Sequence, residues 1–157
     1  MKRKGFTLIE LLAVIVVLAI IALIATPIVM NTIKNAKKGA AERTADNYIK
    51  QVETAVAEAK LENKSVPNGT YDIDGNGNLT GAGLPDGKLE INMSGNKPTS
   101  GTVTISNGEV SQNETTMVVG DYDVKYNQEK EKYEATEKGN TSVIYKNGEV
   151  VYFNVDD

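Results

Sequence analysis

The first thirty residues constrain this chain more than any other part of its sequence. Three basic residues at positions 2–4 precede Gly5, and in the 25 residues from Phe6 to Met30 the only ionisable side chain is Glu10. At about 1.5 Å per residue, a helix of that length crosses a hydrocarbon core of roughly 30 Å. An acid within such a span costs about 2.5–3.5 kcal/mol even on lenient insertion scales, so Glu10 needs a partner.

The same segment has a second interpretation and an ambiguous orientation. A secretory signal peptide has a shorter apolar core and a closing pattern of small residues, so we do not expect removal of the whole segment. The cations at 2–4 favour a cytoplasmic N-terminus, but Lys34, Lys37, Lys38 and Arg43 follow the other end of the span. Counting charges therefore leaves the orientation undecided.

The junction between the basic residues and the apolar run carries a specific motif. Lys4-Gly5-Phe6-Thr7-Leu8-Ile9-Glu10 resembles the prepilin peptidase site of type IV pilins and of the related pseudopilins. The resemblance implies that prepilin peptidase cuts on the cytoplasmic side after Gly5 and that the exposed amine of Phe6 is then methylated. It extends along the helix to Pro27, where the family often has a helix-breaking proline.

The resemblance also implies an α+β, pilin-like fold, in which a long N-terminal helix packs on an antiparallel β-sheet head. We expect a cleaved leader at 1–5, a membrane and polymerisation helix at 6–30, an amphipathic helix at 31–62 and the head at 63–157. The implied location is the cytoplasmic membrane, as a single-pass prepilin with a cytoplasmic N-terminus, and then a pilus filament at the cell surface. The implied partners are related pilin subunits, prepilin peptidase, the inner-membrane assembly machinery and, before assembly, membrane lipid.

Cleavage supplies a partner for Glu10. A cut after Gly5 creates a charged amine on Phe6 near the depth of Glu10, and methylation keeps that charge. Subunits stacked in a filament can pair the two groups across their interface. Such a pair fixes the register, because a misaligned neighbour leaves a buried charge uncompensated. A membrane anchor that never polymerises is expected to gain nothing from Glu10.

Pro27 lies inside the apolar helix. A proline within a helix removes one backbone hydrogen bond and costs roughly 3 kcal/mol unless the helix bends. One interpretation is a simple kink at the membrane exit. The other, which the resemblance implies, is that the turns before Pro27 are a weak point that extends when the subunit is packed or pulled.

Beyond the span, apolar residues recur at steps of three and four, which predicts an amphipathic helix lying on its own domain. The helix is expected to end before the stretch 63–69, which is dense in turn-forming residues. The apolar face comprises Ala45, Tyr48, Ile49, Val52, Ala55, Val56 and Ala59.

The remaining chain predicts antiparallel strands. Asn107-Gly108 and Asn147-Gly148 each lie between alternating segments, and Asn-Gly in that position is the strongest short signal for a hairpin. Strands are predicted around these turns at 102–106, 109–112, 142–146 and 149–153. Further strands are expected at 70–73, 88–93, 116–119, 121–126 and 131–135.

One segment of the predicted head is rich in oxygen-bearing side chains. Asp72, Asp74, Asn76 and Asn78 alternate around two glycines, and the first six residues fit the D-x-[DN]-x-[DN]-G opening of a calcium loop. An EF-hand loop needs glutamate at its twelfth position, where this chain has Gly83. A calcium site and a polar β-turn built from Asp, Asn and Gly therefore both stay open, and no other cofactor is expected.

The composition argues against catalysis. The chain has no histidine and no cysteine, which excludes Ser-His and Cys-His catalysis, ordinary zinc sites and disulfides, so we expect no enzyme. Without a disulfide, it resembles the cysteine-poor pilins of Gram-positive bacteria. Its net charge of −4, which falls to −7 when the three cations at 2–4 are removed, disfavours a broad nucleic-acid surface.

Three functions remain open at this point. The first is a type IV pilin, which polymerises through its N-terminal helix and displays residues 63–157. The second is a pseudopilin of a type II secretion or competence DNA-uptake system. The third is a membrane-anchored binding domain that never polymerises. The size of the head favours the first over the second, and Glu10 argues against the third.

Overall fold

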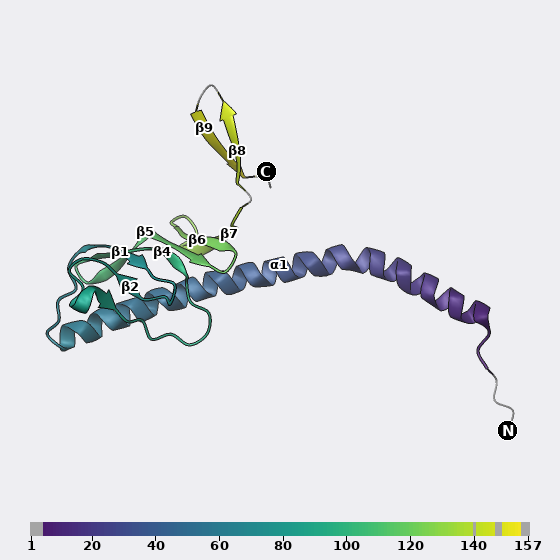
Figure 1. Ribbon diagram of the computed structural model, residues 1–157, viewed down its shortest axis with the longest axis horizontal. Helices are drawn as coiled ribbons and strands as arrows, with labels where there is room; N and C mark the ends of the chain where they lie inside the picture. Colours follow the sequence, from purple (N-terminus) through teal and green to yellow (C-terminus); the bar gives the residue numbers. More distant parts are fainter. Residues whose placement is uncertain (1–4, 140, 147–148, 155–157) are drawn as a thin grey trace. The chain divides into compact units, whose positions relative to one another are not determined.

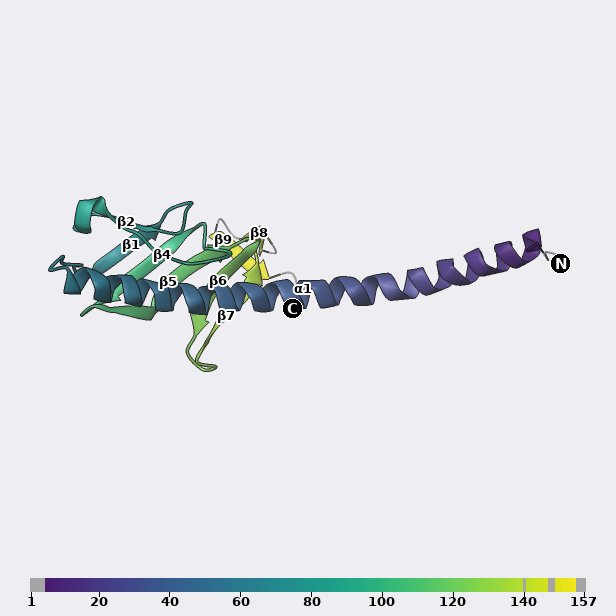
Figure 2. The same cartoon turned by 90° about the horizontal axis from the view of Figure 1, so that it is seen from below.

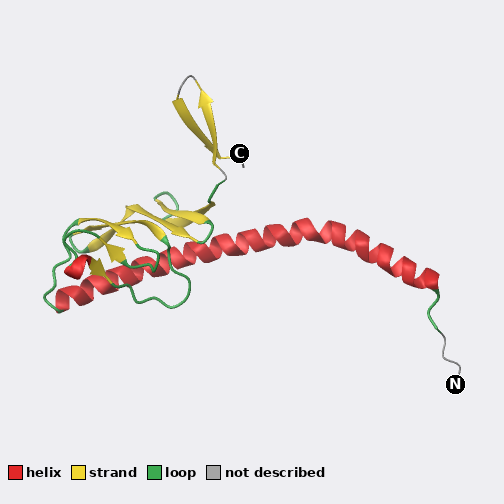
Figure 3. Cartoon of the chain, viewed as in Figure 1, coloured by secondary structure: helices red, strands yellow, loops and turns green. Residues whose placement is uncertain are grey.

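The computed structural model describes the backbone of residues 5–139, 141–146 and 149–154 and the side chains of residues 5–139. The chain forms two compact units, Met1–Lys37 and Lys38–Asp157. Helix α1 belongs to both, and the strands belong to the second (Figures 1 and 3). The elements are α1 (Leu8–Leu61), β1 (Gly69–Ile73), β2 (Leu79–Thr80), the 3-10 helix η1 (Pro85–Gly87), β3 (Lys88–Leu89), β4 (Ser100–Ser106), β5 (Glu109–Val119), β6 (Tyr122–Asn127), β7 (Lys132–Glu137), β8 (Thr141–Lys146) and β9 (Glu149–Asn154).

The first unit contains the apolar part of α1, coloured purple to blue in Figure 1. Large hydrophobic side chains from Leu8 to Ile33 are about half exposed or more. An 18-residue window here has a mean hydropathy of 3.2, and among the described residues α1 is the helix long and apolar enough to cross a membrane. The predicted long apolar helix is therefore present, with its large side chains exposed among the described residues, and its insertion in a membrane stays a prediction.

In the second unit, α1 lies along one face of the β-sheet (Figure 2). All seven residues of the predicted apolar face are buried, and Ala41 extends that face by one turn. They pack in one core with residues from the sheet, including Leu79, Val103 and Met117. The helix ends at Leu61, just before the predicted turn-rich stretch. The α+β architecture with a long N-terminal helix is thus confirmed.

The sheet has seven strands in the order β3-β2-β1-β4-β5-β6-β7, and each neighbouring pair is antiparallel. The β4–β5 hairpin turns at Asn107 and Gly108, whose φ angles of 55° and 80° are both positive, as a type I′ turn requires. This turn confirms the Asn-Gly prediction at 107–108. Gly101 has a φ of 130°, and a Cβ there would collide with the Thr116 backbone in β5, so glycine allows the two strands to approach.

Two strand predictions were wrong in extent. Residues 116–119 are not a separate strand, because β5 runs without a break from Glu109 to Val119 across a register shift between Thr102 and Thr104 of β4. The strand expected at 88–93 stops at Leu89. Beyond it, the Ile91 N–H donates to the side chain of Asn78 at 3.1 Å, and the Ile91 carbonyl accepts from Lys97 Nζ at 3.1 Å. Side chains thus take the bonds that a strand ladder would have made.

The C-terminal strands β8 and β9 pair with each other in a separate two-stranded sheet. Their register joins Thr141 to Asn154 and Lys146 to Glu149, which confirms the strands predicted on either side of Asn147-Gly148. The Asn147-Gly148 turn itself lies outside the described residues.

Two tyrosines in the core of the second unit differ in one respect. Tyr71 donates its hydroxyl to the carbonyl of Pro67 at 2.6 Å. The Tyr48 hydroxyl, on α1, is buried without a hydrogen-bond partner among the described residues. Burial raises the pKa of Tyr48, and the negative charge of Asp74 raises it further. The buried hydroxyl of Tyr48 therefore carries an uncompensated desolvation cost. Tyr71 offsets its own desolvation cost through its hydrogen bond to Pro67.

This difference predicts opposite effects for the same chemical change. Tyr48→Phe should raise the free energy of unfolding by about 1 kcal/mol, because it removes an unsatisfied buried hydroxyl. Tyr71→Phe should lower it by about 1 kcal/mol, because it leaves the Pro67 carbonyl without its donor. Thermal unfolding of both variants in detergent micelles measures the two shifts, and equal signs would contradict the assignment.

Candidate functional site

The start of α1 is closed by a reciprocal pair of hydrogen bonds between Thr7 and Glu10. The Thr7 backbone N–H and hydroxyl each donate to Glu10 Oε2 at 2.8 Å, and the Glu10 N–H donates to Thr7 Oγ1 at 3.4 Å. This arrangement is a capping box, in which Thr7 is the N-cap and Glu10 the third helical residue. Glu10 therefore has donors within its own chain.

This pair corrects one step of the sequence argument. We expected a solitary membrane anchor to gain nothing from Glu10, but an N-cap contributes about 0.5–2 kcal/mol to any helix that has one. The signal was present in the sequence, since Thr7-Leu8-Ile9-Glu10 has the spacing of a capping box directly before an apolar run. Glu10 alone therefore no longer argues against the third function.

The peptide bond between Gly5 and Phe6 lies in a non-helical segment just before α1. Phe6 is 90% exposed, and a Cβ built on Gly5 meets no atom within 4 Å. The segment is therefore non-helical and accessible, as a peptidase substrate needs to be. Lys4 and the rest of the predicted leader lie outside the described residues.

The comparisons with known proteins bear on this same segment. Residues 1–26 match the family model described as the prokaryotic N-terminal methylation motif. The chain has a prepilin N-terminus. These residues accordingly resemble the N-terminus of prepilins, the group that includes type IV pilins and pseudopilins, and the expected methylation motif is confirmed. No curated protein and no solved structure matches the chain significantly.

Pro27 lies within the continuous helix of this prepilin-like segment. Having no N–H, it leaves the carbonyl four residues earlier without its helical donor. The hydroxyl of Thr26, the residue directly before Pro27, donates to the Ala22 carbonyl at 2.7 Å. The hydroxyl of Thr32, in the second turn after Pro27, donates to the Ile28 carbonyl at 3.0 Å. Threonine bonds of this kind loosen and bend helices. Extension of this region in a filament stays a prediction.

The oxygen-rich segment of the head forms the loop between β1 and β2. Asp74 Oδ1 accepts the backbone N–H groups of Asn76 and Asn78, both at 2.8 Å, and the Asn78 amide lies 3.3–3.4 Å from the same carboxylate. Asp72 is exposed on β1. The Asp74 carboxylate thus serves its own loop as an Asx turn. Calcium binding by Asp72, Asp74, Asn76 and Asn78 stays a prediction.

These donors set the acidity of Asp74. The backbone N–H of Asn78 is the main cause that lowers the pKa of the Asp74 carboxyl, and the Asn78 side chain, the Asn76 N–H and Lys88 lower it further against partial burial. Asn78 is itself 8% exposed and accepts the Ile91 N–H, so the loop joins β1 to the segment after β3. Asp74 is therefore a structural residue of the head.

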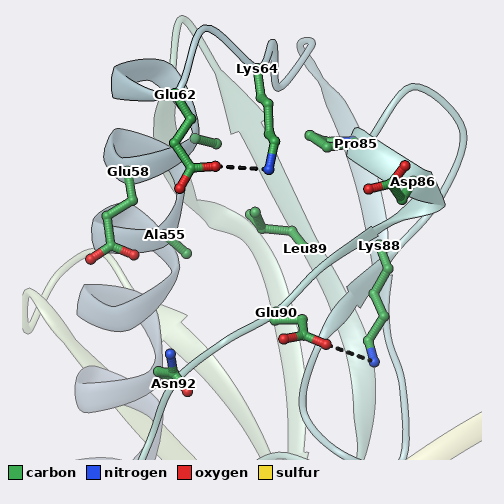
Figure 4. A pocket seen from close by; sticks show the side chains of 11 residues that line it. Ala55, Glu58, Glu62, Lys64, Pro85, Asp86, Lys88, Leu89, Glu90 and Asn92 are labelled. Atoms are coloured by element: carbon green, nitrogen blue, oxygen red, sulfur yellow. Dashed lines mark ion pairs between the residues drawn. The ribbon is translucent and has the colours of Figure 1, made fainter.

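A groove at the C-terminal end of α1 was not predicted from the sequence. It encloses about 480 Å³ between the helix and the segment around β3 (Figure 4). Four acids and two lysines give its lining a net charge of −2. Both lysines are in ion pairs, Glu62–Lys64 at 2.7 Å and Lys88–Glu90 at 3.7 Å. The lining residues are Ala55, Glu58, Ala59, Glu62, Lys64, Pro85, Asp86, Lys88, Leu89, Glu90 and Asn92. Their chemistry is that of a solvated acidic surface.

The hydrogen bonds of Asp74 predict a pH-dependent effect of Asp74→Asn. Because the pKa is lowered in the folded state, the carboxylate stabilises the fold above about pH 4 and loses that effect as the pH falls through the folded pKa. Asp74→Asn should lower the free energy of unfolding by about 1 kcal/mol at pH 7, and the difference from wild type should shrink as the pH falls below about 4.

The matched control is Asp72→Asn, since Asp72 is exposed two residues earlier on β1. Its stability should stay within about 0.5 kcal/mol of wild type at every pH. Thermal unfolding from pH 2 to pH 7 measures both variants, and a constant deficit for Asp74→Asn across that range would contradict the role of its charge.

Proposed function

We propose that this prepilin-like chain is a structural subunit of a type IV pilus. Prepilin peptidase processes it after Gly5, and the mature chain polymerises through its N-terminal helix into a surface filament. The observation that carries the proposal is the match of residues 1–26 to the N-terminal methylation motif at the start of a helix whose apolar residues are exposed in its own chain.

The proposed route begins in the cytoplasmic membrane. The apolar run inserts as a single span with the basic leader on the cytoplasmic side, where prepilin peptidase and the assembly machinery act. Lipid then covers the exposed side chains of α1, since apolar surface left in water costs about 25 cal/mol per Å². In the filament, helices of neighbouring subunits take the place of lipid. This exchange explains why the chain leaves its longest apolar surface unpaired.

Glu10 has two successive roles in this proposal. In the single subunit, its carboxylate accepts the Thr7 N–H and hydroxyl and so stabilises the helix start. In the filament, it also compensates the amine of Phe6 on a neighbouring subunit. The first role needs only an acceptor oxygen, while the second needs a negative charge. A neutral isostere separates the two.

The cleavage step is tested with Gly5→Val. The variant should keep Met1 in mass spectra of the membrane fraction and should yield no filaments, because a branched side chain replaces hydrogen at the proposed cut. The fold should be unaffected, since nothing lies within 4 Å of a Cβ at this position.

Gly39→Ala is the matched control, because a Cβ at Gly39 is equally free of contacts and alanine favours a helix by about 1 kcal/mol. Its cleavage and filament yield should equal those of wild type by mass spectrometry and negative-stain microscopy of surface-sheared material. If the Gly5→Val strain still formed filaments, and these lacked this chain, the chain would instead be a minor pilin or a pseudopilin. Wild-type surface material that begins at Met1 would overturn the proposal.

The assembly role is tested with Glu10→Gln. Glutamine can complete a capping box as well as glutamate can, so the helix should form and the leader should be removed. Filament yield should nevertheless fall by more than tenfold, because an unpaired buried amine costs about 3–5 kcal/mol. Normal filaments from this variant would show that Glu10 acts only as a cap.

A further inference from the structure

Strand β7 ends the seven-stranded sheet of the described residues, and its backbone groups alternate in direction. The Lys138 N–H donates to the Asp121 carbonyl at 2.7 Å, just beyond the β6 pairing, whereas the Ala135 N–H donates to Glu42 Oε1 at 3.3 Å. Since backbone groups alternate along a strand, the even-numbered residues of β7 face β6. Tyr133, Ala135 and Glu137 direct theirs to the outer edge.

Among the described residues, the β8–β9 hairpin pairs with no strand of the larger sheet. It forms a sheet of only two strands, and an isolated hairpin of this kind is marginally stable in water. Seven of its twelve strand residues are Val, Ile, Tyr or Phe, a composition typical of strands within a larger sheet. The sequence of the hairpin therefore predicts a partner strand.

We propose that the β8–β9 hairpin adds to the outer edge of β7 in the same chain, so that β8 pairs antiparallel with β7 and the sheet grows to nine strands. Only three residues, 138–140, separate the end of β7 at Glu137 from the start of β8 at Thr141. Three-residue connections are common in hairpins.

The connection length sets a register that matches the core. Pairing Glu137 with Thr141 places Val143 opposite Ala135 and Tyr145 opposite Tyr133. Ala135 and Tyr133 are each 2% exposed, on the face of the sheet that packs in the core. The observed pairs Val143–Tyr152 and Tyr145–Val150 continue the same two rows into β9, so apolar residues extend the rows of Ala135 and Tyr133.

Backbone direction selects the same register. In a two-residue hairpin, the pair of residues that flanks the turn exchanges backbone hydrogen bonds. Lys146 and Glu149 are that pair here. The backbone N–H and C=O groups of Lys146 and of the other even-numbered residues of β8 therefore face β9. The odd-numbered residues of β8 face away from β9, toward the odd-numbered residues of β7. A slip by one residue breaks this match and brings Lys146 to the core-facing row.

Glu42 is the group that docking displaces. Its carboxylate holds the Ala135 N–H at 3.3 Å, longer than the usual 2.9–3.0 Å for such a bond. A backbone carbonyl of β8 replaces it, and the half-buried carboxylate of Glu42 turns to solvent. Until then, a charge on the open edge discourages pairing with other chains.

The test is a disulfide in the full-length chain, which has no native cysteine. Thr136 is exposed, and the proposed register makes Thr136 and Ser142 a non-hydrogen-bonded pair, whose Cα atoms lie about 4.5 Å apart, within disulfide range. Thr136→Cys with Ser142→Cys should oxidise within one chain in detergent micelles, giving a monomer on a non-reducing gel and a mass loss of about 2 Da for two hydrogens.

Asp123→Cys with Ser142→Cys is the matched control. Asp123 pairs with Thr136 across β6 and β7, so it lies one strand farther from β8, beyond disulfide range at about 9–10 Å. The first pair should oxidise at least tenfold faster than this one. Equal rates, or disulfide-linked dimers in place of monomers, would overturn docking within the chain.

Hydrogen exchange of the wild-type chain gives a readout that needs no variant. The amides of Val143 and Tyr145 face away from β9 in the proposed register, so in an undocked hairpin they exchange freely. Docking should slow their exchange at least tenfold, to the level of the even-numbered amides of β8. Fast exchange at both odd-numbered positions would overturn the proposal even if the cysteine variants failed to fold.

Discussion

The organisation of this molecule depends on one helix whose two parts need different surroundings. The apolar part of α1 leaves its large side chains exposed, so that part is stable only against lipid or other helices. From Ala41 to Ala59 the same helix instead buries one face in the core of its own head. The transition needs no loop, because the helical backbone satisfies its own hydrogen bonds in either medium. The environment changes along the helix, and the sequence changes its apolar pattern to match.

The head is held by this helix face and by the antiparallel ladders, without any disulfide. Side chains add bonds where the ladders stop. Asp74 and Asn78 close the β1–β2 loop and reach the Ile91 backbone, and Tyr71 anchors Pro67 after the helix. Such local bonds do what a covalent link does in other small domains, which is to keep irregular segments on the core. Their contribution is spread over several groups of about 1 kcal/mol each.

Features set by local chemistry were predictable from the sequence, and features set by tertiary contacts were not. Helical periodicity identified every residue of the buried helix face except Ala41, and Asn107-Gly108 identified its turn. The end of β3 was missed because the Asn78 side chain, thirteen residues earlier, takes the Ile91 N–H. At the candidate site, the processing motif could be recognised from the sequence because its residues are contiguous in the chain. The capping role of Glu10 was equally local, but the cost of a carboxylate in an apolar span pointed to a partner on another chain instead.

The capping box has a consequence for the order of events at the membrane. Thr7 and Glu10 define the first turn of α1 without using any atom of residues 1–5. Removal of the leader, as proposed, would therefore leave these hydrogen bonds at the helix start intact, so no refolding would have to follow the cut. The new terminus is only one residue from a fixed cap, which restricts the positions its charge can occupy. In the proposed processing, the exposed amine would therefore already be restricted in position, and a subunit entering assembly would lose less conformational entropy on aligning it.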